Sequence, residues 1–206
     1  MKTKLFTISM VLFFIMINCK KSDNDINDIL DKKPTNNSFT LNDESYKIDK
    51  GFFQKVNRTQ NNNISQRFGI SITSEFILYD SIYDAFLGKG NVVAFSINSS
   101  DLDKIKPGTY IVDKSFNQGT PNTFDAEVDI NYNSSNYSDE IEYELNDNFE
   151  GKLEIKKIGE EYEITYNFVV EMDIRVKGYY KGKLQNASPS NSALGLNKNL
   201  SYGKVK

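Results

Sequence analysis

Residues 151–184, GKLEIKKIGEEYEITYNFVVEMDIRVKGYYKGKL, decide the fold class of this chain. Apolar and polar side chains alternate along most of the segment, and the main interruptions are Gly159-Glu160 and residues 171–173. Alternation with a period of two is typical of strands that bury one face and expose the other. Glycine in the first position of a two-residue turn favours a type II′ hairpin. The segment therefore predicts three consecutive antiparallel strands joined by tight turns.

The two turns also predict the register of these strands. A shift of one residue would turn each apolar set toward water, so the register is strongly specified. On the inner face we expect Ile155 opposite Ile164, Leu153 opposite Tyr166 and Phe168 opposite Val176. On the outer face we expect Lys156 opposite Glu163, Glu163 opposite Lys181 and Glu161 opposite Lys183.

A fourth strand is expected upstream, at residues 139–145, DEIEYEL, with a three-residue loop at 146–148 that sets Ile141 against Leu153. These registers place three tyrosines opposite glycines: Tyr143 opposite Gly151, Tyr166 opposite Gly178 and Tyr162 opposite Gly182. A tyrosine ring can cover the bare backbone of a glycine, and such glycines let a sheet coil sharply. We therefore expect a strongly curved meander over residues 139–184.

Period-two alternation also runs through the middle of the chain. It predicts further strands at residues 46–56, 64–73, 92–98, 109–113 and 124–132. The expected fold is all-β, an antiparallel β-barrel or β-sandwich of roughly eight strands that ends in the four-stranded meander. A lipocalin-like barrel is one form that this fold could take.

The N-terminus has the pattern of a secretory leader. Two lysines, Lys2 and Lys4, precede an apolar run at residues 5–17 that is too short to span a membrane. Cys19 is the only cysteine of the chain and follows this run. A lone thiol is a liability in an oxidising compartment, and acylation would consume its sulfur. The alternative is an ordinary secreted protein with a buried thiol.

MINCKK, residues 16–21, resembles the lipobox of bacterial lipoproteins, although Asn18 stands where such boxes carry Gly, Ala or Ser. KKSDND, which begins at Lys20, resembles the export signal of Bacteroidetes-type surface lipoproteins. The segment 151–184 is similar to the closing hairpins of small lipoproteins of that type, many of them β-barrel- or β-sandwich-like. These resemblances imply an acylated Cys19 and a protein anchored in the outer membrane that faces outside the cell.

The expected organisation follows from these features. Residues 1–18 form a signal peptide, and residues 19–37 form the lipidated cysteine and a disordered tether. Residues 38–184 form the antiparallel β domain, and residues 185–206 form a polar, flexible tail. Three leucines of the tail could dock weakly on the domain: Leu194, Leu196 and Leu200.

Composition excludes several classes of function. The chain has no histidine, which removes Ser-His-Asp and Cys-His catalysis and histidine-containing zinc sites. It has no glycine-rich phosphate loop and no dinucleotide fingerprint, so we expect no cofactor. Loss of residues 1–18 would remove two lysines and no acidic residue, changing the formal charge from −3 to −5. An acidic chain is not expected to bind nucleic acid.

Two predicted strands carry acidic outer faces, Asp125, Glu127 and Asp129 on one and Glu140, Glu142 and Glu144 on the other. If these strands pair, like charges face each other, which is unfavourable. The faces are either solvated and partly neutralised by Lys152, or they bind calcium, which prefers oxygen ligands. The calcium candidates are Asp125, Glu127, Asp129, Glu140 and Glu142. No EF-hand spacing is present, and we expect no dedicated metal site.

Residues 75–91, EFILYDSIYDAFLGKGN, interrupt the alternation. They form either an apolar lid over the core or a loop whose aromatic side chains meet a ligand; the candidates are Tyr79, Tyr83 and Phe86. Asp80-Ser81-Ile82 resembles the short O-glycosylation sites of such bacteria, with Ser81 as the acceptor. A basic stripe on the last strand either attracts an anionic ligand or pairs across strands: Arg175, Lys177, Lys181 and Lys183.

We expect a lipid-anchored cell-surface binding or accessory protein without catalysis, holding a glycan, a peptide, a small apolar molecule or a partner protein. The alternative is a structural or assembly component of the envelope that pairs through an exposed sheet edge. A third possibility is a glycosidase-like enzyme with two carboxylates. A lipocalin-like binder requires a closed barrel with an apolar cavity, and an assembly subunit requires a filled core and an unprotected edge.

Overall fold

The computed structural model describes residues 36–56, 64–136, 138–145 and 150–188, all within the unit Pro34–Lys206. The predicted leader, Cys19, most of the tether, the loop 146–148 and the leucines of the tail lie outside the described residues. The described part is all-β and contains no α-helix. No helix in these ranges is long and apolar enough to cross a membrane.

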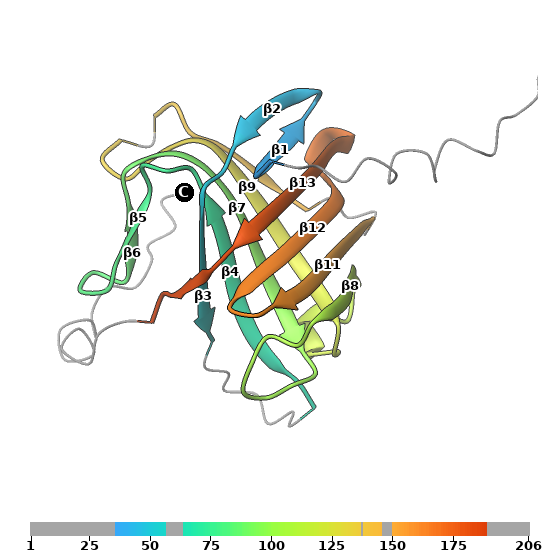
Figure 1. Ribbon diagram of the computed structural model, residues 1–206. Coiled ribbons are helices and arrows are strands. Elements are labelled where there is room, and N and C mark those ends of the chain that lie inside the picture. Colours follow the sequence, from blue (N-terminus) through green and yellow to red (C-terminus); the bar gives the residue numbers. More distant parts are fainter. Residues whose placement is uncertain (1–35, 57–63, 137, 146–149, 189–206) are drawn as a thin grey trace, which may run out of the picture. The chain divides into compact units, whose positions relative to one another are not determined.

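The described residues form the following strands (Figure 1): β1 Ser38–Leu41, β2 Glu44–Lys47, β3 Lys50–Lys55, β4 Gln66–Thr73, β5 Leu78–Asp80, β6 Ala85–Leu87, β7 Lys89–Ser99, β8 Gly108–Val112, β9 Thr123–Asn133, β10 Ile141–Glu144, β11 Gly151–Ile158, β12 Glu161–Val170, β13 Ile174–Gly182 and β14 Leu184–Asn186. Two 3-10 turns, η1 Phe116–Gln118 and η2 Glu171–Asp173, lie between strands. β14 includes Gln185 and Asn186, so the expectation that the flexible tail begins at residue 185 is wrong for these two residues.

One large sheet dominates the fold and curls into a half-barrel (Figure 1). Its strand order is β14-β3-β4-β7-β9-β8-β11-β12-β13-β1-β2, with β10 attached to β9. It has twelve strands rather than about eight, and it is mixed rather than purely antiparallel, because β8–β9 and β14–β3 are parallel pairs. These pairs join only two and three residue positions. Alternation looks the same in either strand direction, so it could not reveal them.

The predicted registers of β11, β12 and β13 are confirmed. Gly159 has a φ of +63° and Glu160 does not have a positive φ, as a type II′ turn requires. The inner-face pairs are Ile155–Ile164, Leu153–Tyr166 and Phe168–Val176. On the outer face, Lys156 lies opposite Glu163 and Glu163 lies opposite Lys181.

The predicted pairing of β10 with β11 is wrong. β10 pairs with β9, where Ile141 lies opposite Ile130 and Tyr143 opposite Val128. The second neighbour of β11 is β8, which sets the buried Tyr110 against Leu153. Because both alternatives set apolar residues opposite each other, periodicity alone could not choose between them.

Of the predicted tyrosine–glycine contacts, the structure contains one as expected. The ring of Tyr166 lies over Gly178, where an added Cβ would be 2.2 Å from Tyr166 Cζ. Tyr162 lies opposite Gly182 in the register, but the ring over Gly182 belongs to Tyr180. Gly182 ends β13, and the next strand, β14, forms the edge of the sheet beside β3.

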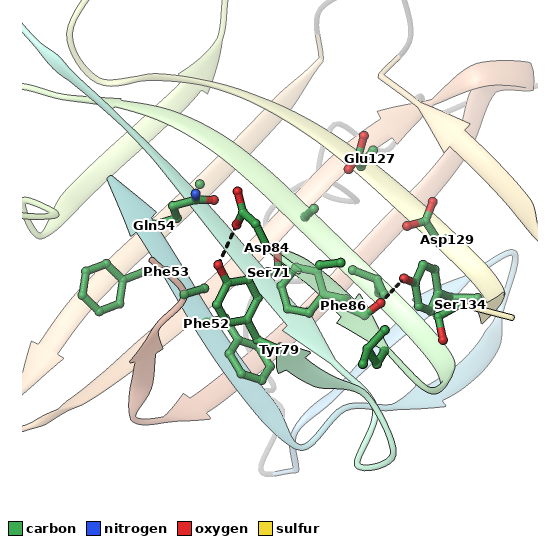
Figure 2. A pocket seen from close by; sticks show the side chains of 17 residues that line it. Phe52, Phe53, Gln54, Ser71, Tyr79, Asp84, Phe86, Glu127, Asp129 and Ser134 are labelled. Atoms are coloured by element: carbon green, nitrogen blue, oxygen red, sulfur yellow. Dashed lines mark hydrogen bonds between the residues drawn. The ribbon is translucent and has the colours of Figure 1, made fainter. Parts of the chain in front are cut away.

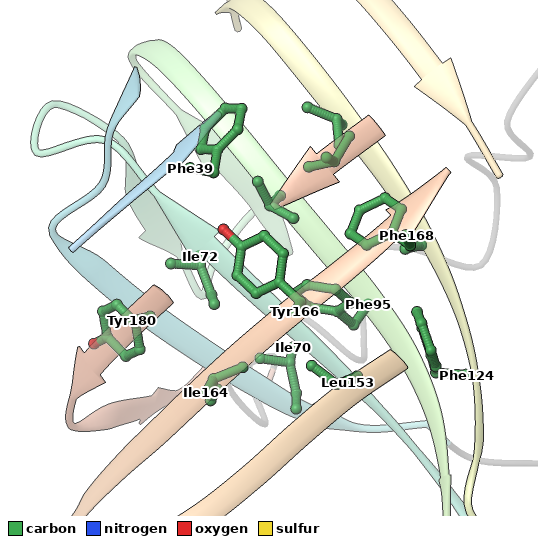
Figure 3. Close-up of a cluster of buried hydrophobic side chains, with 14 of the residues drawn as sticks. Phe39, Ile70, Ile72, Phe95, Phe124, Leu153, Ile164, Tyr166, Phe168 and Tyr180 are labelled. Atoms are coloured by element: carbon green, nitrogen blue, oxygen red, sulfur yellow. The ribbon is translucent and has the colours of Figure 1, made fainter. Parts of the chain in front are cut away.

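Aromatic rings fill the inner side of the curl (Figure 3). Phe95 packs edge-to-face against Tyr166, with ring centroids 5.1 Å apart. Phe124 and Phe168 complete the cluster, and each packs against Phe95. Edge-to-face packing of this kind is favourable beyond the burial of apolar area. The centre of the curl is therefore packed core rather than an open apolar cup.

Candidate functional site

A groove of about 630 Å³ lies on the outer face of the sheet, beneath the hairpin formed by β5 and β6 (Figure 2). Its floor is built from β3, β4, β7 and β9. The lowest part of the floor carries small residues: Ser71 lies opposite Ala94, and Gly69 follows on the same face of β4. A Cβ added to Gly69 would have no atom within 4 Å, so this part of the floor faces open space.

One wall of the groove is aromatic. Tyr79 of β5 and Phe86 of β6 lie opposite each other on the hairpin face that looks toward the sheet. Their ring centroids are 5.6 Å apart, and the ring of Phe52 on β3 lies 5.3 Å from that of Phe86. The Tyr79 hydroxyl donates a hydrogen bond of 2.6 Å to Asp84 Oδ1, which fixes the ring (Figure 2).

The hairpin is held on the sheet at both of its ends. Ile77, at its start, is 0% exposed. At its end, Gly88 has a φ of +118°, and a Cβ there would lie 2.0 Å from the carbonyl oxygen of Phe76. The Tyr132 hydroxyl donates a 2.6 Å hydrogen bond to the carbonyl of Phe86, and the amide of Gly88 donates one of 2.9 Å to Ser134 Oγ. The groove is therefore preformed by buried and hydrogen-bonded contacts.

The other wall is acidic. Glu127 and Asp129 of β9 line the groove, apart from the aromatic rings (Figure 2). On β10, Glu142 lies opposite Asp129 and Glu144 opposite Glu127. The like charges therefore face each other, as the sequence indicated for paired acidic strands. No ion pair among the described residues includes any of these four carboxylates.

The acidic wall holds protons more tightly than free carboxylates do. The pKa of Asp129 rises to about 7, first because surrounding protein displaces water and then because Glu127, Glu140 and Glu142 repel its negative charge. The pKa of Glu127 is also raised, by loss of water and by the charge of Glu142 above the other neighbours. The neighbouring negative charges therefore make ionisation of Asp129 and Glu127 harder.

The predicted ligand-binding side chains are only partly brought together. Tyr79 and Phe86 line the groove, whereas Tyr83 lies near the hairpin tip, 70% exposed, and does not. Ser81 lies in the turn of the hairpin and is partly exposed. The interpretation of this segment as a lid over the core is wrong, because the hairpin packs on the outer face of the sheet.

The predicted calcium candidates share one surface of β9 and β10, but the described residues contain no group of three or more His, Cys, Asp or Glu that could hold a metal ion. Lys152 does not neutralise this surface. It belongs to β11, which does not border β9 or β10, and its ammonium lies 2.5 Å from Glu154.

Three residues of the basic stripe, Arg175, Lys181 and Lys183, form ion pairs with acidic residues outside β13. Arg175 contacts Glu150 at 3.3 Å, Lys181 contacts Glu161 at 3.9 Å, and Lys183 contacts Glu160 rather than Glu161. This favours the structural interpretation of the stripe over an anion site.

Neither the floor of the groove nor the contacts that Phe52 and Tyr132 make with the hairpin were predicted from the sequence. Gly69, Ser71 and Ala94 are small residues at outer-face positions, and this pattern has meaning only once β4 is known to lie beside β7. Phe52 and Tyr132 lie on the predicted strands 46–56 and 124–132, and alternation alone does not show that either ring lines a groove. Comparisons with protein-family models, with curated proteins and with solved structures give no match to this chain.

Proposed function

We propose that this chain is a lipid-anchored cell-surface protein that binds a small ligand in the outer groove and does not catalyse a reaction. One observation carries the proposal: a preformed groove of about 630 Å³ joins a floor of small residues to an aromatic wall and an acidic wall. Its volume is within the range of small-ligand sites, and such sites combine aromatic surface with a few polar groups.

The surface location is supported by the leader pattern alone. Replacing Cys19 by Ser should leave the full chain without an acyl group and release it from the membrane fraction. Uptake of radiolabelled palmitate by the Cys19→Ser chain would contradict the lipid anchor.

The assembly alternative has less support. The edge strand β2 is four residues long and carries Glu44 and Lys47, and the side strand β10 is four residues long and carries Glu142 and Glu144. Short, charged edges discourage pairing with another chain. These strands are therefore poor templates for an envelope subunit that assembles by strand addition.

A glycosidase-like enzyme is the second candidate, because the raised pKa of Asp129 would suit a general acid. Glycosidases of this type need a partner carboxylate that stays ionised. The pKa of the other carboxylate of the acidic wall, Glu127, is raised as well. Two carboxylates shifted in the same direction support a charge-binding wall better than an acid–nucleophile pair.

The groove itself is tested by filling it. A leucine at Gly69 would project into open space, and the backbone there is not left-handed, so the Gly69→Leu chain should fold. The matched control is Thr165→Leu, on β12, which does not line the groove. In a ligand screen of the full chain by saturation-transfer NMR, using glycans, short peptides and small apolar molecules, hits should survive Thr165→Leu and weaken at least tenfold in Gly69→Leu. Hits unaffected by Gly69→Leu would place binding elsewhere.

A further inference from the structure

Two ion pairs join outer-face charges of neighbouring strands among β11, β12 and β13. Lys156 contacts Glu163 at 4.0 Å, and Lys181 contacts Glu161 at 3.9 Å. On β9 and β10, by contrast, Asp129 lies directly opposite Glu142, and Glu127 directly opposite Glu144. Like charges at directly opposed positions destabilise a sheet. A cation supplied from outside the described residues would relieve this repulsion.

The aromatic wall indicates what kind of cation fits. The rings of Tyr79 and Phe86, backed by the buried Phe52 that packs on Phe86, offer apolar surface to the groove and attract a positive charge through the ring quadrupole. A bare metal ion would leave this surface unused. The described residues also lack a group of three carboxylates that could hold a metal ion. The site therefore fits a charged group attached to an apolar body.

We propose that the groove selects a small organic cation, in which an amine or guanidinium group meets Glu127 and Asp129 while a flat apolar body packs on Tyr79 and Phe86. This inference rests on the proposed function, because it requires the groove to be the binding site, and it adds the chemical class of the ligand. The charged group replaces the missing counterion, and the floor at Gly69, Ser71 and Ala94 gives the body room.

The protonation of the wall supports this assignment. The charged groups around Asp129 are Glu127 on its own strand, Glu142 opposite on β10, and Glu140. The hairpin contributes Asp84 to the groove, and the neighbouring positions of β7 are the uncharged Val92 and Ala94. A bound cation favours the ionised forms of Asp129 and Glu127, whose pKa values are raised in its absence. Binding should therefore release protons and strengthen as the pH rises through 7.

The test compares two probes of nearly the same shape, phenethylamine and the neutral 2-phenylethanol, titrated calorimetrically into the full chain at pH 8. Phenethylamine should bind at least tenfold more tightly. In the double variant Glu127→Gln/Asp129→Asn the two affinities should become equal within about twofold. Glu171→Gln removes an exposed carboxylate in the β12–β13 turn and should leave the tenfold ratio unchanged.

The outcomes separate this inference from the proposed function. Equal binding of both probes by the wild-type chain, lost in Gly69→Leu, would overturn the cation assignment and leave the groove as a binding site. Binding of neutral sugars alone would have the same consequence. Absence of binding by both probes would also overturn the cation assignment. If, in addition, no molecule of the ligand screen were sensitive to Gly69→Leu, the proposed function would fail too.

Discussion

Glu142 of β10 lies directly opposite Asp129 of β9, on the outer face of the sheet, and neither carboxylate has a cationic partner among the described residues. Water is partly excluded from Asp129, so the repulsion acts on a group that is already costly to ionise. A fold that needed only stability would place a lysine at one of these positions. The uncompensated pair is therefore the feature that most directly links the sheet to the proposed ligand.

The first prediction concerns pH. The pKa of Asp129 rises from 3.8 to about 7 in the folded chain, so the folded state binds the proton more tightly than the unfolded state. Its contribution to stability is complete below about pH 4 and is lost as the pH rises to about 7. In urea unfolding, the wild type should lose about 1–2 kcal/mol more than Asp129→Asn across this window, a value reduced for partial solvent screening. Equal pH slopes for the two chains would contradict the raised pKa.

The second prediction reverses one charge of the pair. In Glu142→Lys an ammonium would face Asp129, so the free energy of unfolding at pH 8 should rise by about 1 kcal/mol. The built-in cation should also weaken phenethylamine binding. Glu171→Lys, which makes the same change of charge in the β12–β13 turn, should alter neither quantity. A loss of stability in Glu142→Lys would show that the opposed carboxylates do not repel.

The third prediction concerns the core. Tyr166 is 2% exposed and its hydroxyl has no hydrogen-bond partner, whereas the hydroxyl of buried Tyr110 donates a 2.6 Å bond to the carbonyl of Lys106. Removing an unpaired buried hydroxyl should stabilise the fold, and removing a paired one should not. Tyr166→Phe should raise the free energy of unfolding by about 1 kcal/mol, and Tyr110→Phe should lower it by about 1 kcal/mol. Equal effects in chemical denaturation would contradict this difference.

The fourth prediction compares two strand glycines. A Cβ at Gly178 would lie 2.2 Å from the ring of Tyr166, whereas one at Gly69 would meet no atom within 4 Å. Gly178→Ala should destabilise the chain by about 2–3 kcal/mol through overpacking. Gly69→Ala should be neutral or stabilise it by about 0.5 kcal/mol, since alanine loses less backbone freedom on folding. Thermal unfolding of both variants checks the curvature of the sheet and the open groove floor together.

Local features of the sequence predicted the C-terminal strands well. The turn at Gly159 and the loop at Glu171–Asp173 set the registers of β11, β12 and β13, because each turn length allows only one register that buries the apolar sets. Pairings across longer loops were not predictable in the same way. The alternation of β10 is compatible with pairing to either β9 or β11. The parallel pairing of β8 with β9 produces no sequence pattern that differs from an antiparallel pairing.

In the candidate site, too, features within one segment were predictable from the sequence, whereas the pairing of distant segments was not. Tyr79 and Phe86 were predicted from the aromatic cluster of one short segment, and the acidic faces from the alternation of two strands. Their combination in one groove depends on the order β3-β4-β7-β9 and on the hydrogen bond from Tyr132 to the carbonyl of Phe86. Neither the strand order nor this hydrogen bond can be predicted from the alternation of polar and apolar residues along one strand. Tyr83 has the same chemistry as Tyr79 but lies near the tip of the hairpin, away from the groove.

We propose that a small ligand binds on the outer face of the sheet and not inside its curl. Methyl NMR tests it directly, because consecutive residues of β7 lie on opposite faces: Val92 and Ala94 line the groove, whereas Val93 is buried in the core. On titration of the full chain with phenethylamine, the methyl signals of Val92 and Ala94 should shift and those of Val93 should not. Shifts confined to Val93 and other core methyl groups would place the ligand inside the curl and contradict the account.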